Sequence, residues 1–247
     1  MEVIAGLDDL NVEVVESMCK FRFNYGKVYW NSRLQAEHDR LVREILRRGG
    51  VRLGSTLPTS SRQIIVADMF AGVGPFSMPL AKSRAIVYAN DLNPDSYAYL
   101  VENVKLNKIS ATHHVCTNLD GREFMVDLVR RKSIRPTDVI MNLPAIATEF
   151  LDVFRGLYVE SDVEANLPTI HCYAFAPEEN FQVELLQRIE TALGTKVVDP
   201  FIHDVRNIAP KKNMYCVTFN LPSEIERVGP NSDASSEHPP MQKKQKL

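Results

Sequence analysis

Two carboxylates and a glycine turn within one short stretch are the residues best suited to chemistry. Asp68 ends an apolar run, the turn Ala71–Gly74 follows it, and Asp91 comes just after a second apolar run at residues 85–89. A helix is predicted between the two runs, because Pro75 suits a first helical turn. The stretch therefore predicts a strand–helix–strand unit with a glycine turn after its first strand and an acid at the tip of its second.

This unit favours a nucleoside ligand with no phosphate at the turn. Glycines such as Gly72 let the backbone approach a ligand closely, and Asp91 can accept hydrogen bonds from ribose hydroxyls. A dinucleotide fingerprint needs a third glycine where Ser77 stands. The Asp68 carboxylate suits an ammonium group instead. We therefore expect S-adenosylmethionine as the cofactor; the simpler alternative is a glycine turn in an α/β domain that binds no sugar.

A second candidate site follows the apolar run Asp138–Met141. Asn142, Leu143 and Pro144 form a turn that can present an amide and backbone carbonyls to the edge of a planar nitrogenous substrate. The carboxyl ends of parallel strands meet at the edge of a sheet where ligands bind. We therefore expect this turn near the glycine turn, although a plain strand-to-helix connection is the alternative.

The remaining elements alternate between strands and helices, the pattern of an α/β sheet with helices on both faces. Asn31 and Ser32 offer N-cap chemistry for a helix that runs to about Arg48. Further strands are predicted at 113–116 and 171–175, a closing hairpin at 201–205 and 214–219, and helices at 94–107, 122–135, 147–157 and 178–193.

Three regions are expected along the chain. Residues 1–30 form a partial domain of short strands, including 21–25 and 27–30, and residues 31–222 form the main domain. Residues 223–247 are polar and lysine-containing, which predicts a disordered tail.

Composition excludes several classes of protein. A net charge of −2 does not indicate a general nucleic-acid binder, so contacts to RNA must come from local clusters such as the arginines between 40 and 62 and the basic helix 122–135. No apolar run reaches the roughly 20 residues of a membrane span, and no secretory signal is visible. The four cysteines lack metal-ligand spacing, so we expect reduced thiols and no metal site.

Several motifs together resemble the archaeal and eukaryotic tRNA (guanine-N1)-methyltransferases that act at position 37. The motifs are VYWNSRLQAEHDRL, DMFAGVGPF, NDLNP, NLDG, MNLPA and VRNIAPKKNMYCV. The resemblance runs from about residue 1 to 222 and implies a Rossmann-like class I methyltransferase sheet preceded by part of a tRNA-binding middle domain. The wybutosine-pathway aminocarboxypropyl transferases are similar around the glycine turn, but MNLPA and the VYWNSRL block favour the methyltransferases.

The resemblance also implies roles for individual residues. It makes Glu37 the general base, Asn142 and Pro144 the residues that hold the target guanine, and Tyr29 a wall of its pocket. The residues implied to contact or underlie S-adenosylmethionine are His38, Phe70, Gly72, Asp91, Leu92, Asp120, Gly121 and Asn142. From the residues alone, Glu37 is most simply a solvated helix residue.

The implied reaction needs such a base. N1 of guanine carries a proton at neutral pH, so a carboxylate must remove it while the methyl group transfers. Positive charge near O6 would stabilise the oxygen on which negative charge develops. In the family an arginine near O6 precedes the segment that matches EVIAG, so the sequence offers no residue for that role.

These observations lead to a functional expectation. We expect methyl transfer from S-adenosylmethionine to N1 of guanosine 37, with the tRNA anticodon loop as partner, a monomer, and no membrane. The alternatives are an aminocarboxypropyl transferase, or a truncated paralogue without the N-terminal tRNA-elbow domain that binds cofactor or RNA without turnover. Cytoplasm, nucleus and mitochondrial matrix are the compartments expected from the family.

Overall fold

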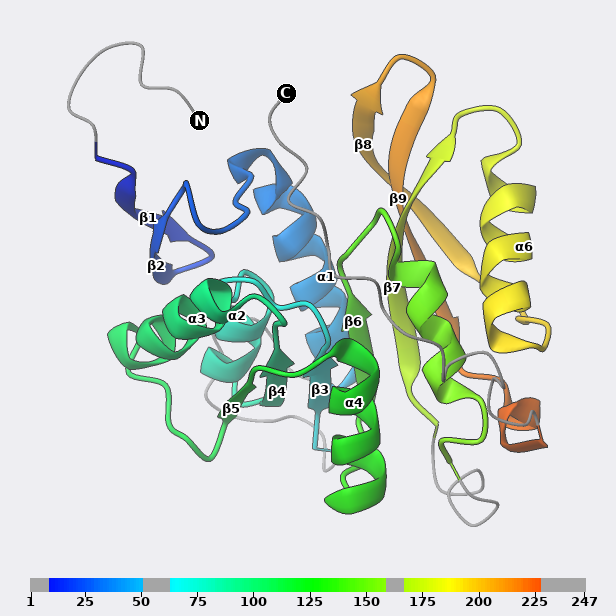
Figure 1. Cartoon of the computed structure of the whole chain (residues 1–247), viewed down its shortest axis with the longest axis horizontal. Coiled ribbons are helices and arrows are strands. Elements are labelled where there is room, and N and C mark those ends of the chain that lie inside the picture. Colours follow the sequence, from blue (N-terminus) through cyan, green and yellow to red (C-terminus); the bar gives the residue numbers. More distant parts are fainter. Residues whose placement is uncertain (1–8, 51–62, 159–166, 228–247) are drawn as a thin grey trace.

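A mixed seven-stranded sheet forms the centre of the protein, whose computed structural model describes residues 9–50, 63–158 and 167–227 (Figure 1). The strand order is β5-β4-β3-β6-β7-β9-β8. Strands β3 to β7 are parallel, whereas β9 is antiparallel to both β7 and β8. The strands are β3 (Ile65–Asp68), β4 (Ile86–Asn90), β5 (His114–Thr117), β6 (Asp138–Met141), β7 (Thr169–Pro177), β8 (Phe201–Ala209) and β9 (Lys212–Asn220).

Helices cover both faces of this sheet, as the alternating pattern predicts. The helices on one face contribute to a core that includes Leu41, Met78 and Leu100, and those on the other to a core that includes Phe124, Leu151 and Leu185. The first set is η1 (Ser32–Leu34), α1 (Gln35–Arg48), α2 (Ser77–Lys82) and α3 (Pro94–Leu106); the second is α4 (Gly121–Val126), η2 (Asp127–Arg131), η3 (Ala147–Phe154) and α6 (Phe181–Leu193). The Rossmann-like arrangement expected from the sequence is confirmed.

A two-stranded hairpin, β1 (Asn11–Glu16) and β2 (Cys19–Asn24), packs against α3. Phe21 and Phe23 are buried in the core that α1 also enters. The backbone N–H of Arg22 donates to Asn103 Oδ1 at 2.8 Å, which joins the hairpin to α3. The described part of residues 1–30 therefore shares its core with the main sheet.

Several predicted elements differ from those observed. Residues 27–30 are not a strand, because the N–H groups of Lys27 and Val28 are used in a turn that closes on Asn24 O. The predicted helix 122–135 stops at Arg131 after a π-helical turn, and Ser133 follows with a φ of 55°. The predicted helix 147–157 ends at Phe154 and is a 3₁₀ helix.

The predicted tail is partly ordered. Ser223–Arg227 forms η4, with Ile225 fully buried and its carbonyl accepting from Gly156 N at 3.1 Å. The expectation of disorder from residue 223 is wrong for these residues, because an apolar side chain there finds a place in the core. Residues 228–247 lie outside the described part, as do Arg52, Arg62 and residues 1–8.

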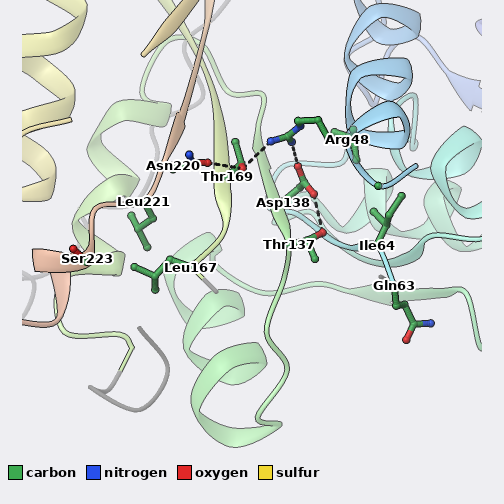
Figure 2. Close-up of a pocket in the computed structure, with 12 residues that line it drawn as sticks. Arg48, Gln63, Ile64, Thr137, Asp138, Leu167, Thr169, Asn220, Leu221 and Ser223 are labelled. Atoms are coloured by element: carbon green, nitrogen blue, oxygen red, sulfur yellow. Dashed lines mark hydrogen bonds and ion pairs between the residues drawn. The ribbon is translucent and has the colours of Figure 1, made fainter. Parts of the chain in front are cut away.

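A chain of hydrogen bonds attaches the end of α1 to the sheet, at the edge where strands β6 and β7 begin (Figure 2). Arg48 is paired with Asp138 and donates to Thr169 Oγ1 at 2.7 Å. Thr169 donates on to Asn220, and Thr137 donates to Asp138. The fully buried His171 also contacts Asp138, with 3.1 Å between Nε2 and Oδ1. Except for His171, these residues line a cavity of about 430 Å³.

We predict that Asp138→Ala lowers the free energy of unfolding by about 2–3 kcal/mol, because it leaves Arg48 and the buried His171 without their shared partner. Chemical denaturation monitored by circular dichroism measures this change. Glu13→Ala, which removes an exposed pair with Arg22, is the control and should have a much smaller effect. Equal effects of the two substitutions would contradict a structural role for the Asp138 cluster.

Candidate functional site

A cavity of about 610 Å³ lies at the carboxyl ends of β3, β4 and β6. Strand order reverses between β3 and β6, because the chain runs from β3 outward to β4 and β5 and then returns to β6 on the other side. Ligands of open α/β sheets bind at this reversal, outside the carboxyl ends of the strands. The two turns singled out in the sequence follow β3 and β6, so the fold brings them together here.

The glycine turn and Asp91 form one end of the cavity. Gly72 and Gly74 have φ values of 56° and 100°, a region that favours glycine, and a Cβ at Gly74 would lie 2.8 Å from Met78. Gly72 N donates to Asp91 Oδ2 at 2.8 Å, and Asn93 N donates to Asp91 Oδ1 at 2.9 Å. Burial raises the pKa of Asp91. The carboxylate is thus fixed by two amides and retains lone pairs for ribose hydroxyls.

Asp68 does not have the position that the sequence suggests. It is fully buried and is not among the residues that line the cavity. Burial, followed by the nearby charge of Asp91, raises the pKa of Asp68 to about 8. At neutral pH Asp68 is therefore mostly a neutral acid, and the expectation that its carboxylate faces an ammonium group is wrong.

The turn after β6 forms the opposite wall. Pro144 O accepts a hydrogen bond from Phe175 N at 3.1 Å, and Leu143 O accepts from Ala147 N at 2.7 Å, so the turn is fixed to β7 and to η3. Asn142 and Pro144 both line the cavity. Asn142 Oδ1 is buried and has no hydrogen-bond partner in the described part of the chain. This acceptor is available to a ligand donor.

Residues from the N-terminal region close the cavity. Tyr29 and Trp30 both line it; Tyr29 is 75% exposed, and the Trp30 ring lies 5.3 Å from Phe21 and 4.9 Å from Phe23. His38 Nδ1 lies 2.6 Å from Glu16 Oε1, which fixes a ring that also lines the cavity. The hairpin β1–β2 therefore positions the wall opposite the sheet.

Glu37 directly precedes His38, which lines this cavity, but Glu37 itself does not line it. The interpretation of Glu37 as a solvated helix residue is wrong, because only 6% of the residue is exposed. Its carboxylate accepts two hydrogen bonds of 2.6 Å from Arg40 and one of 2.7 Å from Tyr173, and His203 Nε2 lies 3.3 Å away. Burial, followed by Cys216 and Glu37, raises the pKa of Tyr173 well above its usual value, so Tyr173 remains a donor.

Three other residues implied by the resemblance also lie outside the lining. Leu92 is 56% exposed, and the carboxylate of Asp120 caps α4 by accepting from Arg122 N at 2.9 Å. Gly121 acts through packing: a Cβ there would lie 2.9 Å from the ring of Phe70, which does line the cavity.

The structure adds wall residues that sequence reasoning did not select. They come from the N-terminal segment and from β7, β8 and β9, and they include Trp30, Phe175, Arg206, Ile208 and Met214. Arg206, Lys211 and Lys212 are close in the sequence, and nothing in their spacing distinguishes Arg206, which lines the cavity, from the two lysines, which do not.

The cavity fits a nucleoside cofactor better than a metal ion. Among the described residues, no group of three His, Cys, Asp or Glu side chains is arranged to hold a metal. The left-handed Gly72, the free space that faces it, and the fixed Asp91 carboxylate are suited to a ribose lying against the turn. In the same ranges, none of the helices has the length and apolar character needed to cross a membrane.

Comparison with known proteins agrees with this geometry. The model of the TRM5/TYW2 methyltransferase domain matches residues 12–199. A tRNA (guanine(37)-N(1))-methyltransferase of Phytophthora infestans is 46% identical over 228 residues, which are 91% of this chain and 51% of that protein. The chain thus spans about half the length of the curated relatives that it matches.

Solved structures show the same fold. Trm5b from Pyrococcus abyssi superposes with a TM-score of 0.67 at 32% identity, over 88% of this chain and 57% of that one. Methanocaldococcus jannaschii Trm5, solved in complex with adenosine, superposes with a TM-score of 0.65 at 26% identity, over 89% of this chain and 57% of that one.

We predict that Asp68 makes the cofactor-free protein less stable as the pH rises. Below about pH 4 both folded and unfolded states hold the proton, whereas between 3.8 and about 8 only the folded state does. The free energy of unfolding therefore falls with pH by up to about 1.4 kcal/mol per unit in this window. Thermal or urea unfolding from about pH 5 to 8 should show this slope reduced in Asp68→Asn. Parallel pH profiles for the two proteins would contradict the prediction.

Proposed function

The chain belongs to the TRM5/TYW2 methyltransferase family, and we propose that it transfers a methyl group from S-adenosylmethionine to N1 of guanosine 37 in tRNA. Relatives that match most of this chain are named for that activity, and this chain spans about half of their length. The observation that carries the proposal is one cavity that joins a ribose-binding end, at Gly72 and Asp91, to a polar end at Asn142.

At the cofactor end, residues of this chain are proposed to bind and orient S-adenosylmethionine. Asp91 is suited to accept from the ribose hydroxyls, the turn at Gly72 allows close approach, and the Phe70 ring and His38 form walls. We propose that Leu92, Asp120 and Gly121 complete this end, Gly121 by seating the Phe70 ring. When bound, S-adenosylmethionine supplies a methyl carbon on a sulfonium; as its bond to N1 forms, the carbon–sulfur bond breaks and the electron pair stays on sulfur.

At the substrate end, Asn142 and Pro144 are proposed to hold the flipped guanine, with Tyr29 on its open side. The unpartnered Asn142 Oδ1 is an acceptor that suits a base N–H group. Extruding the base from the anticodon loop costs a few kcal/mol of unstacking. A rigid turn fixed by Phe175 N and by the start of η3 offsets part of that cost by needing no ordering of its own.

Glu37 is proposed as the general base that takes the N1 proton. Both its oxygens accept hydrogen bonds in the ligand-free protein, so it must turn away from Arg40 to reach a substrate. Hydrogen bonds of catalytic groups are often rearranged only in the substrate complex. His203 lies 3.3 Å from Glu37 and is one-third exposed, so it contacts both the carboxylate and solvent and can accept the proton afterwards.

The wider expectations from the sequence are part of the same proposal. Exposed members of the two arginine clusters, such as Arg47 and Arg131, are available for phosphate contacts, whereas Arg40 and Arg48 are used within the fold. Binding to tRNA should then weaken steeply with salt. We propose that the protein acts as a monomer in the cytoplasm, nucleus or mitochondrial matrix.

Methyl transfer from labelled S-adenosylmethionine to an unmodified tRNA transcript tests this function. We expect label in a transcript with guanosine at position 37, mapped to N1 by nuclease digestion and mass spectrometry, and none in a matched transcript with adenosine there. A mass increase of an aminocarboxypropyl group would identify the alternative transferase. Cofactor binding without incorporation into either transcript would refute the proposed activity for this chain.

We predict that Glu37→Gln lowers kcat by about 10²- to 10⁴-fold, the range for loss of a general base, and leaves the affinity for S-adenosylmethionine nearly unchanged. Single-turnover kinetics and calorimetric cofactor titration measure the two quantities. Glu44→Gln removes a more exposed carboxylate from the same helix and should retain activity. Retention of turnover in Glu37→Gln would contradict the assignment of Glu37 as the general base.

A further inference from the structure

We infer that Glu16, at the tip of the β1–β2 hairpin, is a positioning residue of the cofactor site: it holds His38 as a charged donor for the carboxylate of the methionine portion. The inference rests on the proposed function above and adds a residue to its cofactor end. His38 lines the cavity, whereas Glu16 does not. Glu16 therefore acts on the ligand through His38.

The two side chains form a buried contact between the hairpin and α1. The side chain of Glu16 is 3% exposed and that of His38 is 5% exposed, and 2.6 Å separates Glu16 Oε1 from His38 Nδ1. An ionised carboxylate only accepts hydrogen bonds, so Nδ1 carries the proton of this contact. Within the described residues Nε2 of the same ring has no hydrogen-bond partner, and it is left for a ligand in the cavity that His38 lines.

Burial favours a charged imidazole in this pair. In the part of the chain that the structure describes, His38 is the one hydrogen-bond partner of the Glu16 carboxylate. A carboxylate buried beside a neutral ring would be an uncompensated charge, whereas an imidazolium neutralises it. The rings of Phe76 and Trp30, 4.8 and 6.5 Å from the imidazole, bring no competing charge. The imidazolium has a second N–H group at Nε2, which is a donor for an anionic acceptor.

The hairpin tip is attached to two helices, which fixes the position of Glu16. Ser17 and Met18 have φ values of 51° and 59°, so the chain reverses in the two residues after Glu16. The Ser17 hydroxyl is hydrogen-bonded to Asp39 of α1, and the Met18 carbonyl accepts from Lys82 of α2 at 2.6 Å. The nearby charged groups of these helices are thus used by the turn, and the buried carboxylate is left to His38.

His38 lies toward the methionine portion of the cofactor. The proposed base acts on the atom that receives the methyl group, so the portion that carries this group lies on the side of Glu37, and His38 is the next residue. The His38 ring also packs against Phe76, which follows the glycine turn. The ribose is proposed to bind at Asp91, beyond that turn. The carboxylate is the anionic group of the methionine portion, and a charge-assisted hydrogen bond from Nε2 suits it.

The cavity offers one competing cation. Among the described residues that line it, His38 and Arg206 are the two that can carry a positive charge. Arg206 is on β8, and strands β3, β6, β7 and β9 lie between β8 and β4, the strand that precedes Asp91. Its Nε donates to the neighbouring carbonyl of Asn207 at 3.3 Å, whereas His38 has a buried carboxylate that orients it. The geometry therefore favours His38.

A binding comparison tests the inference without turnover. Calorimetry measures the affinity of the chain for S-adenosylhomocysteine and for its decarboxylated analogue, which retains the ammonium group. The unaltered chain should prefer S-adenosylhomocysteine by about 10- to 100-fold, the range for one charge-assisted hydrogen bond. Glu16→Gln should lose most of this preference. Asp39→Asn is the matched control, because it alters a carboxylate that attaches the same hairpin but does not contact a ring in the cavity.

Two further measurements separate positioning from general stability. Nitrogen NMR of labelled histidine, assigned with His38→Asn, should show protons on both ring nitrogens of His38 in the unaltered chain and loss of the charged form in Glu16→Gln. The double variant Glu16→Gln/His38→Asn should bind S-adenosylhomocysteine no more weakly than His38→Asn. Such non-additive losses are expected where one residue acts through the other.

Each outcome bears on Glu16 separately from the proposed function. If the chain transfers no methyl group yet prefers the carboxylate ligand only when Glu16 is present, the proposed activity fails and the inference stands. An unchanged preference in Glu16→Gln overturns the inference, and its loss in Arg206→Gln instead assigns the carboxylate to Arg206. An equal loss of affinity for both ligands, or a His38 ring protonated on Nδ1 alone in the unaltered chain, overturns it as well.

Discussion

The attachment of α1 to the sheet is the constraint on which the site depends. Near the start of the helix, the Glu37 carboxylate accepts hydrogen bonds from Tyr173 of β7 and from Arg40 of its own helix. At the end of the helix, Arg48 pairs with Asp138 and donates to Thr169 at the start of β6 and β7. Two polar attachments along one helix fix its rotation as well as its distance from the sheet. His38, which must face the cavity, is fixed by the same rotation.

Polar groups around the cavity have different roles because their surroundings differ. Asp91 is held by two backbone amides beside open space, whereas Asp68, one strand away, is enclosed and has a pKa of about 8. Two carboxylates charged so close together would repel each other, and the buried one holds its proton. Asp68 at the end of β3 is thus part of the buried structure, whereas Asp91 after β4 is the carboxylate proposed to bind the ribose.

Sequence reasoning located the elements whose signal is local. The glycine turn, Asp91 and the Asn142–Pro144 turn each follow an apolar run, and the parallel sheet brings the ends of such runs together. Glu37 and Arg206 were not recoverable from the residues alone, because their positions depend on contacts with distant strands. Glu37 is buried only because Tyr173 and His203 approach it, and Arg206 faces the cavity only because of one extra residue in β8. Neither effect has a local pattern.

The burial of Glu37 creates a conflict between stability and its proposed role in catalysis. Three hydrogen bonds occupy the Glu37 carboxylate in the ligand-free protein, and releasing it from Arg40 leaves a guanidinium without its partner. Because Arg40 is only partly buried, water can replace the lost contact at modest cost. Tyr173 has no such access to water and would keep its bond to Glu37. For the proposed base, the geometry therefore favours a motion in which the carboxylate turns about its hydrogen bond from the Tyr173 hydroxyl, the contact that also attaches α1 to β7.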